Sequence, residues 1–410
     1  MFRVFFQEQY MNRAVCRIFQ AGMKLGMHFL PWHVPELIRG EGSSVKAADD
    51  IRKKGIERVM IVTGPGMKKR GLMEPMLARM DELGIAYEIF DSLTSDPADI
   101  QVSEGAELYR KSGAQGIVLF GGGSPMDCGK AIAACIARPG KSVSQLQGVL
   151  RVRHRKAVPH MWAVPTTAGT GSEATMAAVI TDHKTHRKKS INDTALIPHT
   201  CILDPILTKG LPPDITAYTG MDALCHAVEA YINGRYSTSA EDEMAEKAVS
   251  LINSSLYRAY CNGSDMQARE NMQLAAFYAG RAFTRGCVGY VHAIGHAVGG
   301  LYGIPHGKAM AVILPHVLDF FGPAAEGRLS QLASAAGITG KAKAQALKDR
   351  IRELDRIMDI PEYLPCIRDE DIPKIAEWAD KEANPLYPVP VIAGRKDLEK
   401  LVYGIKTKNN

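Results

Sequence analysis

The stretch GIVLFGGGSPMDCGK, from Gly116 to Lys130, indicates the class of fold. Its first half is a short apolar run, which is typical of a strand buried in a parallel sheet. Three glycines follow, and Pro125 suits the first turn of a helix, so we expect a helix to begin after Pro125. Such a glycine turn lets the backbone approach a ligand, and the helix that follows offers its N–H groups to an anion. The alternative is a plain strand-to-helix turn that binds nothing.

The sequence on both sides of this stretch alternates strand and helix patterns. Further strands are predicted for RVMIVTG (58–64), AYEIFDS (86–92), the run that begins with HMWAVP at 160, and TCILDP (200–205). This alternation predicts an α/β domain with a mostly parallel sheet. After about Leu211 the apolar residues follow a helical period instead. We therefore expect a helical extension over 1–26, an α/β domain over 27–208 and an all-helical domain over 209–410.

Composition excludes several classes of protein. Of the 410 residues, 46% are hydrophobic and 23% charged, which is typical of a globular domain, and no apolar run is long enough to span a membrane. The net charge of +6 includes no dense block of Lys and Arg, which argues against nucleic-acid binding. The eight cysteines are scattered without a CxxC pair. This favours reduced thiols in a cytoplasmic enzyme.

Residues 1–26 are basic and apolar, with four cationic side chains and a single acid, Glu8. A transit peptide or a helix on a membrane surface has a similar composition. We favour a helix packed on the body of the protein or on a second subunit.

A second loop of small polar residues, PTTAGTGSE (165–173), follows the predicted strand at 160. Thr166, Thr167 and Thr170 supply hydroxyl groups, and the two glycines keep the loop close to whatever it covers. The loop suits polar contacts to a dinucleotide, and the alternative is a hydroxyl-rich surface turn.

Histidines are concentrated in GYVHAIGHAVGGLYGIPHG, from Gly289 to Gly307. His292 and His296 are spaced i, i+4 on one helix face, and His306 begins a new element after a Gly-Ile-Pro break. Asp222 and His226, in MDALCHAVEAY, have the same i, i+4 spacing. One carboxylate with several imidazoles suits Fe²⁺ or Zn²⁺ better than Ca²⁺ or Mg²⁺. Separate hydrogen bonds on buried helices are the alternative explanation.

Four motifs in this order, GGGSPMD, PTTAGTGSE, DALCHAVEAY and HAIGHAVGGLYGIPHG, resemble those of the iron-containing (group III) alcohol dehydrogenase family, and a late NPLYP begins at Asn384. The resemblance implies a Rossmann-like, dinucleotide-binding α/β domain followed by an all-helical metal-binding domain, the architecture of dehydroquinate synthase. It also implies a homodimer that uses a small-molecule alcohol or aldehyde as substrate.

The resemblance also implies the site residues. The metal ligands would be Asp222, His226, His292 and His306, whereas His296 would lie near the nicotinamide and the substrate as a catalytic residue. The reaction would interconvert a primary or small secondary alcohol and its aldehyde or ketone by hydride transfer, with the alkoxide held on Fe²⁺, or on Zn²⁺ as the alternative. Simple helix packing is the alternative role for His296.

Cofactor contacts are implied for two groups of residues. The predicted contacts to the dinucleotide are Gly64, Gly122, Gly123, Ser124, Asp127, Thr166, Thr167, Thr170, Val179 and Lys188. Two positions depart from the family pattern. Gly64 stands where NAD-preferring relatives carry an Asp that binds the ribose, and Lys68, Lys69 and Arg70 follow it, which favours NADP(H) over NAD(H). Asp96, in TSDP, replaces a common Asn, and its effect is open.

Three other functions fit parts of this pattern. A zinc polyol dehydrogenase of the glycerol type would use a three-ligand set that leaves His226 unused. A lyase resembling dehydroquinate synthase shares the fold, the NAD and the metal. A catalytically silent member of the fold would not need four ligating residues at the four ligand positions.

Overall fold

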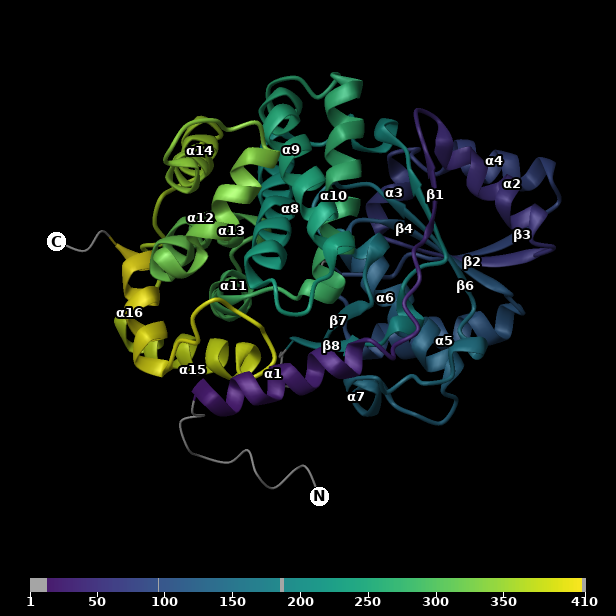
Figure 1. Cartoon of the computed structure of the whole chain (residues 1–410). Coiled ribbons are helices and arrows are strands. Elements are labelled where there is room, and N and C mark those ends of the chain that lie inside the picture. The colour runs from purple at the N-terminus through teal and green to yellow at the C-terminus, as the bar shows by residue number, and fades with distance from the viewer. Residues whose placement is uncertain (1–12, 95, 185–187, 408–410) are drawn as a thin grey trace. The chain divides into compact units, whose positions relative to one another are not determined.

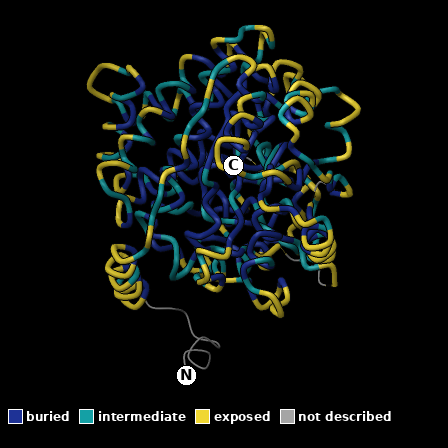
Figure 2. The backbone as a smooth tube through the Cα atoms, turned by 90° about the vertical axis from the view of Figure 1, so that its right-hand side faces the viewer, coloured by how far each residue is buried: buried dark blue, intermediate teal, exposed yellow. Residues whose placement is uncertain are grey.

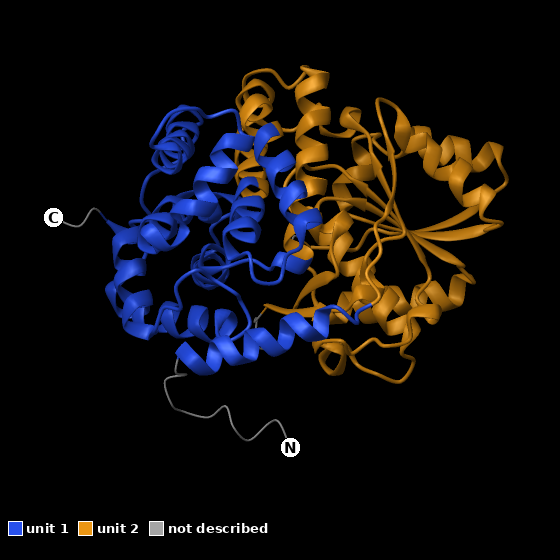
Figure 3. Cartoon of the chain, viewed as in Figure 1, with its two compact units in different colours: residues 1–30, 224–250, 285–410 blue, residues 31–223, 251–284 orange. Residues whose placement is uncertain are grey.

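The computed structural model describes residues 13–94, 96–184 and 188–407. The chain divides into two compact units, of residues 1–30, 224–250 and 285–410 in the first and residues 31–223 and 251–284 in the second (Figure 3). This division differs from the predicted bounds of 27–208 and 209–410, which follow secondary structure and stay a prediction. Of the predicted extension over 1–26, the first twelve residues lie outside the described part.

The second unit is built on a sheet of six parallel strands in the order β1-β9-β6-β4-β2-β3 (Figure 1). The strands are β1 (Glu36–Arg39), β2 (Arg58–Thr63), β3 (Ala86–Phe90), β4 (Gly116–Gly121), β6 (His160–Pro165) and β9 (Thr200–Leu203). The five predicted strands are all present and all parallel. The α/β class predicted from the sequence is therefore confirmed.

Helices cover both faces of this sheet. Alternate residues of β4 enter two different cores: Ile117 and Leu119 join a cluster with residues of α5, α6 and α7, whereas Val118 and Phe120 join a cluster with residues of α2 and α4. Figure 1 draws α2 and α4 above the sheet and α5 and α7 below it. Burial on both faces explains why the strand is a continuous apolar run rather than an alternating one.

The remaining elements before residue 209 are short helices and a second, three-stranded sheet. They are η1 (Ser43–Val45), α2 (Lys46–Lys53), α3 (Pro65–Lys69), α4 (Glu74–Glu82), α5 (Asp99–Ser112), α6 (Gly123–Ala137), α7 (Val143–Leu146), β5 (Gly148–Val149), η2 (Arg155–Ala157), η3 (Ser172–Ala174), β7 (Ala177–Thr181), β8 (Lys188–Asn192), η4 (Thr194–Leu196) and η5 (Pro205–Thr208). The second sheet has the order β5-β8-β7.

Two details differ from the sequence-based expectation. Helix α6 begins at Gly123, before Pro125 rather than after it. Proline is accepted there because the first N–H groups of a helix have no partner within the helix. The strands β1, β5, β7 and β8 were not predicted, since they are short or carry too few apolar residues to show a pattern.

Residues 209–407 are helical, and the described part of that region contains no strand, as predicted. The helices are α8 (Pro213–Asn233), α9 (Ser239–Cys261), α10 (Met266–Gly286), α11 (Tyr290–Tyr302), α12 (His306–Phe321), α13 (Pro323–Ala335), α14 (Lys343–Ile357), η6 (Asp369–Asp371), α15 (Ile372–Ala383) and α16 (Arg395–Lys406). The divisions between the two units in this region fall inside helices: between Ala223 and Leu224 in α8, between Ser250 and Leu251 in α9, and between Thr284 and Arg285 in α10.

Helix α1 (Arg13–Met27) belongs to the first unit and packs on it along one side. In Figure 2 it follows the grey N-terminal trace and is mostly exposed. Its Arg17 donates a hydrogen bond to the Pro390 carbonyl, and its buried Gln20 donates to the carbonyls of Pro385 and Tyr387. Among the described residues, no helix combines the length and the apolar character that crossing a membrane requires.

Candidate functional site

The glycine loop at the end of β4 has no room for a side chain at Gly121. Gly121 has a φ of +146°, and a Cβ atom there would lie 2.7 Å from Cγ of Pro125. Gly122 is the N-cap residue of α6 and Gly123 its first residue. The turn therefore presents bare backbone amides at the positive end of a 15-residue helix, as an anion-binding loop requires.

The threonine loop lies directly against the glycine loop. The Thr166 amide donates a 3.0 Å hydrogen bond to the Gly121 carbonyl, which continues the pairing of β6 with β4. A Cβ atom on Gly122 would lie 3.4 Å from the side chain of Thr167, and one on Gly123 would lie 2.9 Å from Cγ2 of Thr170. The structure thus brings together the two loops that the sequence predicted as cofactor contacts.

Glycines also allow the threonine loop to pack closely against helices α8 and α10. Gly171 has a φ of +60°, and a Cβ atom on Gly280 of α10 would lie 2.4 Å from the Gly171 carbonyl oxygen. A Cβ atom on Gly169 would lie 2.7 Å from the backbone oxygen of Thr219 in α8. The loop is therefore fixed by direct contact with two helices. Sequence reasoning missed Gly280, because a single glycine in a helix does not reveal what it touches.

The Asp127 side chain forms hydrogen bonds with the threonine loop and with strand β7. Its carboxylate accepts a hydrogen bond from the Ser172 hydroxyl at 2.7 Å and one from the Val179 amide at 3.0 Å. Burial raises the pKa of Asp127, which the nearby Lys130 opposes. Of the predicted cofactor residues, Asp127 thus fixes the position of Val179.

Lys130 is a buried cation that the sequence reasoning did not single out. Its ammonium group donates to the hydroxyls of Ser172 and Thr175 and to the carbonyls of Ser172, Thr175 and Ala177. Burial lowers the pKa of Lys130 to about 8 and raises the pKa of its neighbour Glu173 to about 7. The only signal was a lysine on an otherwise apolar helix. Its contacts tie α6 to the segment that follows the threonine loop.

Gly64 lies at the end of β2 and is the N-cap residue of α3, in which Lys68 and Lys69 form the last turn. A Cβ atom on Gly64 would meet no atom within 4 Å. The position therefore has space for a larger group, and cationic side chains follow within one turn.

Lys188 and Asp96 form an ion pair with a 2.6 Å distance between Nζ and Oδ1, and both side chains are exposed. The ion pair connects Lys188, a predicted cofactor contact, with Asp96, a position that departs from the family pattern. Asp96 thus partly neutralises the charge that Lys188 would offer to an anion.

Three of the predicted metal ligands come together. Asp222 of α8, His292 of α11 and His306 at the start of α12 each offer one ligand atom, and these atoms all lie within 4.8 Å of one another. His226 is not part of this group, but its ring stacks on that of His292 with 4.3 Å between centroids. The donor set of one carboxylate and imidazoles fits Fe²⁺ or Zn²⁺. The assignment of His226 as a ligand stays a prediction.

Glu229, which sequence reasoning missed, orients His292. Its carboxylate accepts a 2.5 Å hydrogen bond from Nδ1 of His292 and a 2.8 Å bond from the Val291 amide. A carboxylate only accepts, so Nδ1 carries the proton and Nε2 carries the lone pair that binds a metal. Glu229 follows Asp222 by seven positions on α8, and this i, i+4, i+7 stripe with His226 was the signal available in the sequence.

His296 lies beside the metal-binding group without belonging to it. Its ring stacks on that of His306 at 5.3 Å between centroids, and its Nδ1 lies 2.8 Å from Oε1 of Glu382 in α15. The Tyr387 hydroxyl donates to the same Glu382 oxygen at 3.0 Å. Burial raises the pKa of Glu382, but the electrostatic interaction with His296 and these hydrogen bonds outweigh it and hold the pKa below its usual value.

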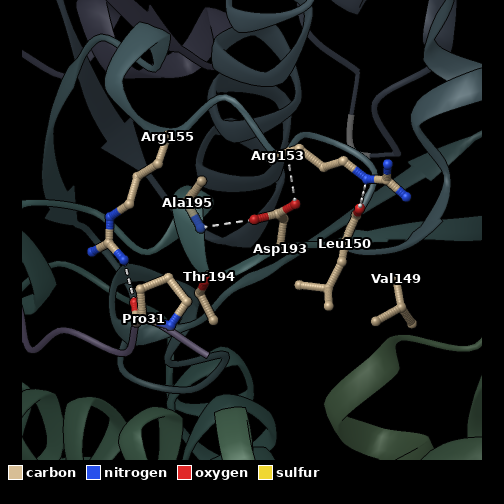
Figure 4. A pocket seen from close by; sticks show the side chains of 8 residues that line it. All are labelled: Pro31, Val149, Leu150, Arg153, Arg155, Asp193, Thr194 and Ala195. Carbon is tan, nitrogen blue, oxygen red and sulfur yellow. Dashed lines mark hydrogen bonds between the residues drawn. The ribbon is translucent and has the colours of Figure 1, made fainter. Parts of the chain in front are cut away.

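The second unit also contains a cavity of about 510 Å³ (Figure 4). It is lined by Pro31, Val149, Leu150, Arg153, Arg155, Asp193, Thr194 and Ala195. The Asp193 carboxylate accepts hydrogen bonds from the amides of Val152, Arg153 and Ala195. Asp193 therefore holds this loop in place, and none of the predicted site residues lines the cavity.

Comparison with known proteins agrees with this geometry. Residues 35–205 match the family model "Iron-containing alcohol dehydrogenase", and residues 216–403 match "Fe-containing alcohol dehydrogenase family, C-terminal". Alcohol dehydrogenase 4 of Schizosaccharomyces pombe is 39% identical over 85% of this chain and 83% of its own length. The 1,3-propanediol dehydrogenase of Klebsiella pneumoniae is 39% identical over 80% of this chain and 87% of its own.

A solved structure of a 1,3-propanediol oxidoreductase superposes with a TM-score of 0.86 at 34% identity, covering 92% of this chain and 100% of that one. The match extends over the sheet and the helical region alike, so the resemblance of the motifs reflects a shared fold. The chain belongs to the iron-containing alcohol dehydrogenase family, and it is a metal-dependent enzyme that interconverts alcohols and their carbonyl counterparts with a nicotinamide cofactor.

Proposed function

We propose that the enzyme interconverts a primary or small secondary alcohol and its aldehyde or ketone, with NADP(H) as the hydride carrier and Fe²⁺ as the metal. The observation that carries the proposal is the group of Asp222, His292 and His306, whose ligand atoms lie within 4.8 Å of one another. The relative from Klebsiella is named for 1,3-propanediol, a primary alcohol, which supports the same class of substrate.

The metal would be held by Asp222, His226, His292 and His306. When bound, Fe²⁺ supplies a Lewis acid that favours loss of the substrate's hydroxyl proton and polarises the carbonyl in the reverse direction. Glu229 keeps Nε2 of His292 available as a ligand, because its carboxylate accepts the hydrogen bond that the protonated Nδ1 donates. His296 would face the reacting substrate and take up the hydroxyl proton as a general base.

The cofactor's pyrophosphate would lie on the amides of Gly122, Gly123 and Ser124, at the N-terminus of α6. Thr166, Thr167 and Thr170 would supply hydroxyl contacts from the adjoining loop, and Asp127, Val179 and Lys188 would complete the binding surface. The absence of a side chain at Gly64 supports NADP(H), because no carboxylate there repels a 2′-phosphate.

The proposal also covers the cellular compartment and the oligomeric state of the enzyme. All eight cysteines are free thiols, which suits a reducing compartment, and we assign the protein to the cytoplasm. We further assign it as a homodimer. Light scattering of the purified protein should give twice the chain mass of 44.7 kDa, and a value of one chain mass would contradict the dimer.

A zinc polyol dehydrogenase is the second candidate. The observation in its favour is that the group within 4.8 Å contains one Asp and two His, the three-ligand set of such enzymes, without His226. Metal analysis of His226→Ala separates the two. Under the main proposal the variant loses most of its metal and activity, whereas under the second candidate it keeps both.

The main proposal is tested by following the absorbance of reduced nicotinamide with butanal as substrate. NADPH and NADH should each be offered to protein loaded with Fe²⁺ or with Zn²⁺. Rapid oxidation of NADPH by the Fe²⁺ form, with little turnover of NADH, is the expected result. Preference for NADH would overturn the cofactor assignment, and faster turnover by the Zn²⁺ form would overturn the metal assignment.

A further inference from the structure

Two histidines one turn apart on α11 each meet a glutamate from a different helix. His292 and Glu229 are almost completely buried, with 3% and 1% of their side chains exposed, whereas His296 and Glu382 keep 29% and 32% exposed. The first pair serves a metal ligand. The second has the same Nδ1-to-carboxylate geometry but remains accessible, as a group that exchanges a proton with a substrate must be.

The Glu382 carboxylate is itself held in place. Its Oε1 accepts the hydrogen bond from Nδ1 of His296 and another from the hydroxyl of Tyr387. The backbone of Tyr387 is fixed at both its polar groups. Its amide donates a hydrogen bond to the Ala383 carbonyl, and its carbonyl accepts one from the Gln20 side chain of α1. The tyrosine therefore approaches Glu382 from a fixed backbone, and the carboxylate has little freedom to turn away from His296.

The first half of the turn that carries Tyr387 is fixed as well. The Asn384 side chain donates to the Asp380 carboxylate and to the Ala393 carbonyl, and it accepts from the Tyr290 hydroxyl of α11. The late NPLYP motif thus has a structural consequence, because it carries Tyr387 on a segment tied to α1, α11 and α15.

We propose that Glu382 is a positioning residue for His296, and that it holds the proton on Nδ1 so that the lone pair of Nε2 faces the substrate. The inference rests on the proposed function, in which His296 contacts the reacting alcohol. Because an ionised carboxylate accepts but does not donate, contact with Glu382 fixes which ring nitrogen bears the proton. Tyr387 keeps the carboxylate in that position.

The proton and the hydride are both accounted for in this arrangement. On oxidation, a bound oxidised nicotinamide would supply the acceptor for the hydride of the carbinol C–H bond, while the O–H bond breaks and its proton passes to Nε2 of His296. A carbonyl forms, and the resulting imidazolium is stabilised by the Glu382 carboxylate. Reduction of the carbonyl runs the same steps backward, so no further oxidant or base is required.

The test is the protonation pattern of His296 by NMR of ¹⁵N-histidine-labelled, Zn²⁺-loaded full-length protein, with the signal assigned through His296→Gln. The wild type should show a protonated Nδ1 and an unprotonated Nε2. Glu382→Ala, which removes the acceptor, should shift His296 to the other tautomer or to a mixture, whereas Glu382→Gln should retain the wild-type pattern because its carbonyl still accepts.

Kinetics of the Fe²⁺-loaded enzyme give the second readout. Glu382→Ala should lower kcat about 10- to 100-fold, the same range as for losing a partner that orients a metal-bound histidine, with the KM for NADPH and the metal content unchanged. Glu382→Gln should fall between the wild type and the alanine variant, since it keeps the tautomer but loses the charge beside the imidazolium. Tyr387→Phe should lower kcat by less than Glu382→Ala. Glu377→Ala, which removes a carboxylate of α15 that pairs with Lys381 instead of with a histidine, is the matched control and should behave as wild type.

An unchanged His296 tautomer in Glu382→Ala would overturn the proposal, as would an unchanged kcat. Should the alanine variant fail to fold, Glu382→Gln and Tyr387→Phe decide: both must lower kcat without changing the metal content, and wild-type rates in both would overturn the proposal. The tautomer is measured without substrate, so a wild type that turns over no alcohol would count against the proposed function and not against this pairing. Full activity in His296→Gln would remove the role of His296 itself.

Discussion

The predicted cofactor loops and the predicted metal-ligand group achieve their geometry in opposite ways. The loops after β4 and β6 depend on side chains that are missing, since a Cβ atom on Gly121, Gly171 or Gly280 would overlap neighbouring atoms. The predicted metal-ligand group depends on the side chains that are present, one carboxylate and two imidazoles whose ligand atoms lie within 4.8 Å of one another. Damage to the first should therefore appear as lost stability or altered cofactor binding, and damage to the second as lost metal in a folded protein.

The largest effect is expected from His292→Ala. The variant should retain its fold but lose metal, and its activity should fall by more than about 100-fold, beyond the cost of losing a partner that only orients a ligand. Metal analysis and the NADPH assay measure both quantities. His316→Ala, which removes a histidine of α12 that is not a predicted ligand, should behave as wild type. A His292→Ala protein with full metal content would contradict the assignment.

A stability effect is expected from Gly280→Ala, whose new Cβ atom would lie 2.4 Å from the Gly171 carbonyl oxygen. Because that contact is with backbone, the free energy of unfolding should fall by about 1–3 kcal/mol. Denaturant unfolding of the metal-free protein measures it. Gly327→Ala in α13, where a Cβ atom meets nothing within 4 Å, is the control and should be neutral or slightly stabilising. Equal stabilities for the two variants would show that the close contact between α10 and the threonine loop is unimportant.

A change of cofactor preference is expected from Gly64→Asp. The new carboxylate has room, since no atom lies within 4 Å of a Cβ atom there, and it would repel a 2′-phosphate while accepting a hydrogen bond from a ribose hydroxyl. We expect the ratio of kcat/KM for NADPH to that for NADH to fall about tenfold or more. Gly64→Ala adds the Cβ atom without the charge and should keep the wild-type ratio. An unchanged ratio in Gly64→Asp would mean that the cofactor's ribose does not approach this residue.

The smallest effect is expected from Asp96→Asn, which breaks the exposed ion pair with Lys188. Since such pairs contribute about 0–1 kcal/mol, the KM for NADPH should fall by no more than about fivefold as the lysine charge becomes available. Lys188→Met should raise the same KM. A rise in Asp96→Asn would show that the ion pair positions Lys188 for the cofactor rather than competing with it.

Sequence patterns were informative where one element carries the signal, and silent where two elements meet. The i, i+4 spacing of Asp222 with His226 and of His292 with His296 marks one helix face, and the apolar run before Gly122 marks a buried strand. Glu382 and Gly280 showed no such signal, because their partners lie on other helices and loops far along the chain. Those contacts depend on how distant elements pack together, which the local periodicity of the sequence does not predict.

The metal requirement is the most direct test of the account. Protein stripped with a chelator should be titrated with Fe²⁺ in the absence of oxygen while the oxidation of NADPH by butanal is followed. The stripped protein should have negligible activity, and the activity should rise with added Fe²⁺ and saturate at one Fe²⁺ per chain. Asp222→Asn should show no such saturation. Full activity in the stripped protein, or an identical titration of the variant, would contradict the assignment of Asp222, His226, His292 and His306 as the metal site.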